Sequence, residues 1–66
     1  MKIIVNGNAV NLETSRTIAD FIIERKVTGT MFAIEKNMEI INKEDYASTE
    51  LQEGDKIELV GFVGGG

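Results

Sequence analysis

A run of three glycines, Gly64, Gly65 and Gly66, is the part of this sequence best suited to chemistry. Glycine has no Cβ, so a glycine segment is narrow and can adopt many backbone conformations. Fully extended, residues 63–66 would reach about 13 Å beyond a folded domain. We therefore expect residues 64–66 to form a flexible tail that carries the carboxylate of Gly66 into a narrow active site on another protein. The alternative is a frayed terminus without function.

Histidine and cysteine are absent from the 66 residues, which excludes most catalytic and metal-binding chemistry. Without them the chain has no thiolate nucleophile and no side chain whose unperturbed pKa lies near neutrality. A disulfide, a zinc finger and a thiolate metal site are excluded for the same reason. We expect a protein that is not an enzyme, has no metal site and no cofactor, and is itself acted on by enzymes.

The acidic surplus of the sequence limits the partners that the chain can have. Eleven Asp and Glu residues against seven Lys and Arg residues give a formal net charge of −4. This charge disfavours binding to nucleic acids and to anionic membranes, which both require basic surfaces. The carboxylates between Glu35 and Glu58 are interpreted as a solvated surface that helps to steer the domain toward a basic partner, rather than as an acid/base pair. We find no signal peptide and no apolar stretch of membrane-spanning length, and expect a cytoplasmic protein.

The first residues predict a β-hairpin. Residues 1–5 are mostly apolar and are typical of a strand. Side-chain alternation puts Ile4 on the face opposite to Ile3. Asn6-Gly7 is a strong turn signal because both residues tolerate a positive φ. Residues 9–12 then form the returning strand.

A helix is expected after the hairpin. Thr17, with Asp20 three residues later, resembles a capping box in which Asp replaces the usual Glu. The apolar residues that follow recur at helical spacing and form one stripe: Ile18, Phe21 and Ile22. We expect the helix to close at residues 24–26, where two cations suit the negative end of the helix dipole, and Gly29 to be its exit residue.

The rest of the sequence predicts three short strands, at 31–34, 39–41 and 56–63. Turns are expected between them, at 36–37 and 53–55. Residues 43–48 are predicted to be irregular or a single helical turn, and Leu51 to be a buried plug. A hairpin, a helix and further strands indicate an α+β fold, with one mixed sheet of four to five strands and one main helix packed on one face. We expect a single domain over residues 1–63.

Three apolar residues are candidates for docking a partner protein. Alternation along the last strand points Leu59 inward, and points Val60 and Phe62 outward beside the tail. If the first strand lies next to the last one, Ile4 joins Val60 and Phe62 on the solvent face. Exposed apolar patches usually mark partner surfaces. The alternatives are apolar residues scattered on a β-rich surface, or a register slipped by one residue, which would exchange the two faces.

Several segments together share the pattern of one known family. They are the opening strand that ends in Asn6-Gly7, the helix start with Thr17-Ile18 and Phe21-Ile22, the segments Phe32-Ala33-Ile34 and Ile40-Ile41, the turn and strand of residues 51–59, and Gly65-Gly66. In this combination the chain resembles the ThiS family of sulfur carriers over essentially its whole length. Gly64 is an additional third glycine that does not disturb the match.

The resemblance implies a ubiquitin-like β-grasp fold and a role in making the thiazole ring of thiamin. A ThiF-like adenylating enzyme would use ATP to convert the Gly66 carboxylate into an acyl adenylate. A cysteine desulfurase, or a sulfur relay protein, would supply a persulfide and leave a thiocarboxylate on Gly66. Thiazole synthase would then accept the sulfur.

Three other functions share parts of this pattern. The small subunit of molybdopterin synthase is another β-grasp sulfur carrier, although such chains are usually longer and have a more aromatic first strand. A ubiquitin-like modifier would also be adenylated but would end in an isopeptide bond. In a plain interaction module the tail would be inert.

Overall fold

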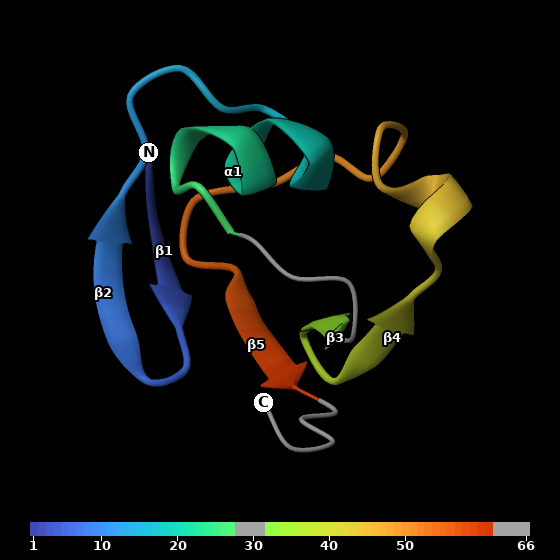
Figure 1. Ribbon diagram of the computed structural model, residues 1–66. Coiled ribbons are helices and arrows are strands. Elements are labelled where there is room, and N and C mark those ends of the chain that lie inside the picture. Colours follow the sequence, from blue (N-terminus) through green and yellow to red (C-terminus); the bar gives the residue numbers. More distant parts are fainter. Residues whose placement is uncertain (28–31, 62–66) are drawn as a thin grey trace.

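The computed structural model describes residues 1–27 and 32–61, which form one sheet and one α-helix (Figure 1). The expectations for Gly29, Phe62 and the glycine tail lie outside these described residues. The elements in chain order are β1 (Lys2–Val5), β2 (Asn8–Asn11), α1 (Ile18–Glu24), β3 (Phe32–Lys36), β4 (Glu39–Ile41), the 3₁₀ turn η1 (Lys43–Asp45) and β5 (Lys56–Gly61).

The sheet has five strands in the order β2-β1-β5-β3-β4. Strand β1 runs antiparallel to β2 and parallel to β5, whereas β3 runs antiparallel to both β5 and β4. Helix α1 lies on one side of this sheet (Figure 1). The predicted mixed sheet with one packed helix is therefore confirmed, and the last strand in the sequence lies at the centre of the sheet.

The hairpin between β1 and β2 has the turn that the sequence predicts. Asn6 and Gly7 both have positive φ, 48° and 85°. Two such residues in succession match the twist of the strands that they join. The register pairs Val5 with Asn8, so the returning strand begins one residue earlier than expected.

The start of α1 is a capping box, as predicted. The Thr17 hydroxyl accepts the Asp20 N–H at 3.2 Å, and the Asp20 carboxylate accepts the Thr17 N–H at 3.1 Å. These bonds satisfy backbone donors that have no partner within the helix. Ile18 and Phe21 of the predicted stripe are buried beneath the helix.

The end of α1 lies within residues 24–26, where the helix was expected to close. The helix stops at Glu24, and Lys26 adopts the left-handed conformation, with a φ of 53°. The Val27 N–H donates to the Ile22 carbonyl at 2.9 Å, and the Lys26 N–H donates to the Ile23 carbonyl at 3.2 Å. This is the Schellman pattern, which glycine usually completes. The two cations lie just beyond the last helical turn, which contains no basic residue.

The core is a single cluster between α1 and the inner face of the sheet. Its members have relative exposures of 5% or less: Ile3, Leu12, Ile18, Phe21, Ile34, Leu51 and Ile57. Leu59 is half-buried and packs against the cluster margin, and Val60, the next residue, is 42% exposed. The predicted alternation along β5 is thus confirmed for its described residues, and Leu51 is the predicted buried plug.

The β3–β4 turn is displaced by one residue from its predicted position. Asn37 and Met38 have positive φ, 50° and 74°, so they occupy the turn positions predicted for residues 36–37. Asn37 also fixes the start of β5. Its N–H donates to the Lys56 carbonyl at 2.8 Å, and its side-chain oxygen accepts the Lys56 N–H at 3.0 Å.

Glu24 of α1 forms hydrogen bonds with the loop that leads into the helix. Glu24 accepts the Glu13 N–H at 2.8 Å, the Ser15 N–H at 3.2 Å and the Ser15 hydroxyl at 2.5 Å. The Ser15 hydroxyl, followed by the Glu13 N–H, holds the pKa of the Glu24 carboxyl below its ordinary value of 4.5. The backbone N–H groups of Arg16 and Thr17 likewise hold the pKa of Asp20 below 3.8.

Ile57→Val tests the burial pattern of β5. Ile57 is 0% exposed, so removing one methylene group should lower the free energy of unfolding by about 0.5–1.5 kcal/mol. Val60→Ala should lower it less, because Val60 faces solvent. Urea unfolding measures both changes, and a larger loss for Val60→Ala would contradict the register.

Glu24→Gln tests whether the Glu24 carboxylate holds the loop before α1. The test uses the pH dependence of the free energy of unfolding. A folded pKa below the unfolded value contributes stability above about pH 4.5, and this contribution is lost as the pH falls through the folded pKa. Glu24→Gln should therefore lower stability at about pH 7 and reduce the loss of stability between about pH 7 and pH 3. The exposed Glu39→Gln is the matched control. If urea unfolding gives wild type and Glu24→Gln the same dependence of the free energy of unfolding on pH, this role of Glu24 is wrong.

Candidate functional site

Strand β5 is the structural base from which the glycine tail continues. On one side it pairs with β3 along nearly its whole length, from Ile57 opposite Lys36 to Gly61 opposite Phe32. The last described residue of the strand is therefore still part of the sheet.

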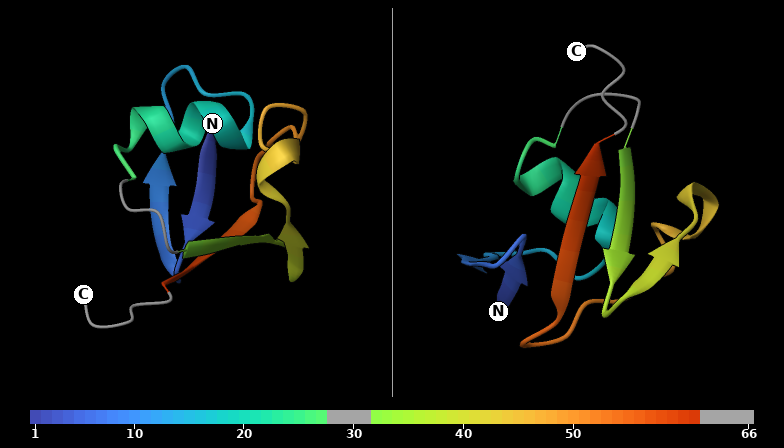
Figure 2. Two further views of the ribbon diagram at one scale, coloured as in Figure 1. Left: turned by 45° about the vertical axis from the view of Figure 1, so that its right-hand side comes forward. Right: turned by 90° about the horizontal axis from the view of Figure 1, so that it is seen from below.

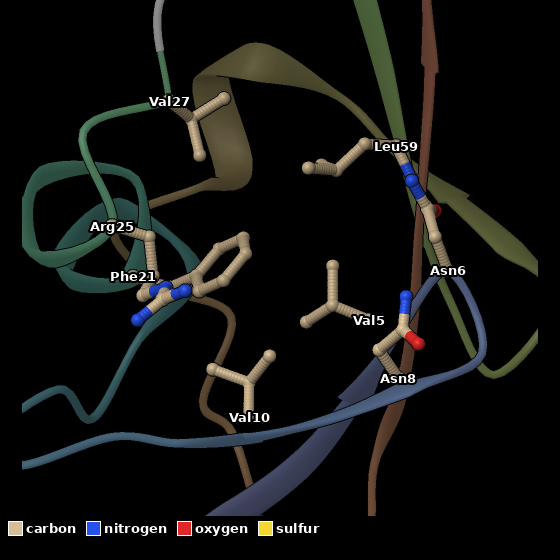
Figure 3. Close-up of a pocket in the computed structure, with 8 residues that line it drawn as sticks. All are labelled: Val5, Asn6, Asn8, Val10, Phe21, Arg25, Val27 and Leu59. Carbon is tan, nitrogen blue, oxygen red and sulfur yellow. The ribbon is translucent and has the colours of Figure 1, made fainter.

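On its other side β5 is held first by β1 and then by one side chain. The Ile4 N–H donates to the Asp55 carbonyl and the Asn6 N–H to the Ile57 carbonyl, each at 2.9 Å. Strand β1 ends at Val5, but the Asn6 side-chain oxygen accepts the Leu59 N–H at 2.8 Å. Asn6 thus continues the ladder beyond the end of β1. The close-up shows its side chain beside Leu59 (Figure 3).

This second role of Asn6 was not predicted from the sequence, which indicates only its turn. The hydrogen bond joins residues 53 positions apart, and no local pattern marks such a contact. The Asn-Gly pair indicates a hairpin turn whether or not the asparagine side chain makes a further bond.

The docking candidates Ile4 and Val60 lie on the face of the sheet opposite α1. We call this the outer face. Ile4 is half-buried and pairs with Lys56, whereas Val60 is 42% exposed and pairs with Ala33. Val60 lies four residues beyond Lys56, or about 13 Å along the strand. The two residues therefore share a face without forming one continuous patch.

Ile40 adds an apolar side chain to the outer face that the sequence analysis did not include. It is 67% exposed and lies opposite Glu35, which in turn lies opposite Glu58. Directly opposed residues in a sheet project to the same face. Alternation along β4 alone puts Ile40 and Ile41 on different faces of the sheet. Which residues of other strands lie beside Ile40 depends on the strand order.

A cavity of about 350 Å³ lies on the side of the sheet that faces α1, beside Leu59 of β5 (Figure 3). Apolar side chains form most of its wall, and Asn6, Asn8 and Arg25 contribute polar atoms. The lining residues are Val5, Asn6, Asn8, Val10, Phe21, Arg25, Val27 and Leu59. Arg25 is the one charged group among them, so the cavity has no acid/base or nucleophilic chemistry.

Two other titratable groups, Asp55 and Tyr46, lie in or beside the core. Asp55 is 8% exposed, accepts the Gln52 N–H at 2.8 Å and lies 3.7 Å from the Lys36 ammonium. Burial raises the pKa of Tyr46 at the core margin.

Within residues 1–27 and 32–61 there is no group of three potential metal ligands. No helix in that part of the chain is long and apolar enough to cross a membrane.

Fold and site together define a β-grasp domain whose central strand leads into a glycine terminus. The ThiS family model matches residues 3–66, and the chain belongs to the ThiS family. The β-grasp expectation is confirmed by the crystal structure of the thiamine biosynthesis protein ThiS from Geobacter metallireducens. The structural match covers the whole of both chains, with a TM-score of 0.85 and 26% identity.

Two kinds of curated relatives match. The sulfur carrier protein ThiS of Bacillus subtilis is 44% identical over 63 residues, which cover 94% of this chain and 96% of that protein. A thiazole synthase of Paramagnetospirillum magneticum is 39% identical over all 66 residues. The chain spans about a fifth (20%) of the length of that synthase. These findings support the sulfur-carrier function for thiamin biosynthesis that the resemblance implies.

Asn6→Gly tests whether the Asn6 side chain holds the end of β5. Glycine keeps the positive φ of the turn but removes the acceptor for the Leu59 N–H. Loss of one hydrogen bond of ~1 kcal/mol should speed hydrogen exchange of the Leu59 amide by about fivefold. Asn6→Asp, which keeps an acceptor, should preserve protection. An unchanged Leu59 exchange rate in Asn6→Gly would contradict this role.

Proposed function

We propose that this chain is a sulfur carrier whose Gly66 carboxylate becomes a thiocarboxylate and donates its sulfur to the thiazole of thiamin. The observation that carries the proposal is the family match through Gly66, on a domain whose central strand leads directly into the glycine terminus. A domain without His or Cys can take part in this chemistry because the reacting group is its own terminal carboxylate.

The carboxylate needs activation because it is a poor electrophile. A ThiF-like enzyme joins it to the α-phosphate of ATP, which gives an acyl adenylate and releases pyrophosphate. A persulfide from a cysteine desulfurase or a sulfur relay protein then attacks the carbonyl carbon and displaces AMP. Cleavage of the resulting disulfide bond by a thiol leaves the thiocarboxylate on Gly66.

The contribution of this chain is presentation of the reacting group. Residues 63–66 can reach about 13 Å when extended, and glycines at 64–66 place no side chain in the way. The same terminus can therefore enter the adenylating enzyme and later the synthase. A narrow entrance also excludes water, which would hydrolyse the adenylate.

Thiazole synthase is the proposed acceptor. In relatives named thiazole synthase, a segment similar to this chain makes up 20% of a longer protein. We infer that carrier and synthase act on one another, and that Ile4, Val60 and Phe62 contribute to docking. We infer that the chain acts in the cytoplasm, where ATP is available, and the net charge of −4 fits protein partners rather than nucleic acid or a membrane.

Deletion of Gly65 and Gly66 tests the proposed function. The wild-type chain, incubated with the adenylating enzyme, ATP, a cysteine desulfurase, cysteine and a thiol, should gain the mass that corresponds to exchange of one oxygen for sulfur. The chain without Gly65 and Gly66 should gain none, because its shortened terminus no longer reaches the reacting centre. Intact-mass spectrometry measures the gain.

Glu13→Gln, an exposed change on the loop before α1, is the matched control and should gain sulfur as the wild type does. If the wild type gains no sulfur while the same enzymes load a known carrier, the proposed function is wrong.

A further inference from the structure

The turn of the first hairpin, Asn6-Gly7, has the chemistry of a self-modifying site. The Gly7 nitrogen can attack the side-chain carbonyl carbon of Asn6, because glycine has no Cβ that hinders the approach. The new C–N bond closes a five-membered succinimide ring, and the side-chain nitrogen leaves as ammonia. Water then opens the ring at either carbonyl, which gives aspartate or isoaspartate at residue 6. The co-reactant of this deamidation is water alone.

Burial gives this dipeptide no protection. Asn6 and Gly7 are both exposed, and a Cβ placed at Gly7 would meet no atom within 4 Å. Among the described residues, none accepts a hydrogen bond from the Gly7 N–H. Water therefore reaches both residues, and any resistance to deamidation must come from their conformation.

The turn conformation keeps the two reacting atoms apart. The φ angles of Asn6 and Gly7, 48° and 85°, belong to a type I′ turn, whose first central residue has a ψ of about +30°. At this ψ the Gly7 nitrogen lies nearly opposite the Asn6 Cβ across the Cα–C bond. Ring closure needs both atoms on the same side of that bond, so the chain must leave the turn before it can react.

Two hydrogen bonds to β5 oppose this rotation. The Asn6 N–H donates to the Ile57 carbonyl at 2.9 Å, and the Asn6 side-chain oxygen accepts the Leu59 N–H at 2.8 Å. The second bond holds the same carbonyl group that the Gly7 nitrogen would attack. Leaving the turn therefore requires that Asn6 separates from the central strand of the sheet.

We propose that Asn6 is a deamidation site that the folded hairpin keeps closed, so that modification records the opening of the hairpin from β5. The rate in the folded chain is the rate in the open chain multiplied by the fraction of time that the hairpin is open. This inference stands independently of the sulfur-carrier function.

The two products differ in their effect on the fold. Aspartate at residue 6 keeps the backbone of the turn and an acceptor for the Leu59 N–H. Isoaspartate carries the chain through its side-chain carbon, which adds one backbone atom to a two-residue turn and displaces the acceptor. The isoaspartate product should therefore lose the bond to Leu59, and the hairpin could not close again as before.

A second asparagine turn supplies the internal control. Asn37 and Met38 have φ angles of 50° and 74°, and the Asn37 side-chain oxygen accepts the Lys56 N–H at 3.0 Å. This turn shares the conformation and the side-chain bond of Asn6-Gly7, but the methionine side chain hinders attack by its own nitrogen. Asn37 should therefore deamidate more slowly than Asn6 when the chain is unfolded.

Peptide mapping by mass spectrometry tests the proposal. The chain is incubated in one mildly alkaline buffer at one temperature, folded and unfolded in guanidinium chloride. Deamidation of Asn6 should be slower in the folded chain by at least about tenfold, equivalent to ~1.4 kcal/mol of opening free energy. In the separated isoaspartate product the Leu59 amide should exchange its hydrogen faster than in unmodified chain.

Three results would overturn the proposal. Equal rates at Asn6 in the folded and unfolded chain would show that the turn and its two bonds give no protection. Deamidation of Asn37 as fast as that of Asn6 in guanidinium chloride would show that Gly7 does not set the site. Unchanged protection of Leu59 in the isoaspartate product would show that modification leaves the hairpin closed.

Discussion

Backbone hydrogen bonding on both sides of β5 is the constraint on which the rest of this molecule depends. β5 is the last strand in the sequence, yet it lies between β1 and β3 at the centre of the sheet. Its pairing sets which side chains point inward, with Ile57 fully buried, and which point outward, with Val60 exposed. It also fixes the point from which residues 62–66 continue, because Gly61 is still paired with Phe32.

The two faces of the sheet serve different purposes. The inner face and α1 bury one small apolar cluster, and turns and caps of the described residues complete it without a disulfide. The outer face keeps Ile40 and Val60 exposed around two opposed carboxylates. In the proposed function several enzymes recognise the chain in turn, and a domain with one face left open by its described elements (Figure 2) would separate recognition from the chemistry at its terminus.

Features encoded by neighbouring residues were predictable from the sequence. The Asn6-Gly7 turn and the Thr17 capping box each depend on interactions within three or four residues, and both lie where predicted. The end of α1 falls within the expected residues 24–26, but its left-handed turn was not predicted, because a lysine rather than a glycine takes that position at residue 26. Glycine is favoured at a left-handed helix end. Here two backbone hydrogen bonds, to the carbonyls of Ile22 and Ile23, stabilise the same turn with lysine in that position.

Features that depend on strand order were harder to predict. Alternation indicates which residues share a face of one strand, but it does not say which strand lies beside it. The Glu35–Glu58 pair requires the β3–β5 register, and the Asn6–Leu59 bond requires β1 beside β5. For the candidate site, the sequence therefore indicated the terminus and the outward direction of Val60, while the placement of Glu35 opposite Glu58 depends on the strand order.

The most direct measurement of the central claim is transfer of the sulfur itself. The chain would be loaded at Gly66 with isotopically labelled sulfur, freed of its loading enzymes and mixed with thiazole synthase and its other substrates. The account predicts that the label enters the thiazole product, with one carrier returned to the carboxylate form for each thiazole made. A labelled carrier that remains intact while an active synthase makes unlabelled thiazole from another sulfur source would contradict it.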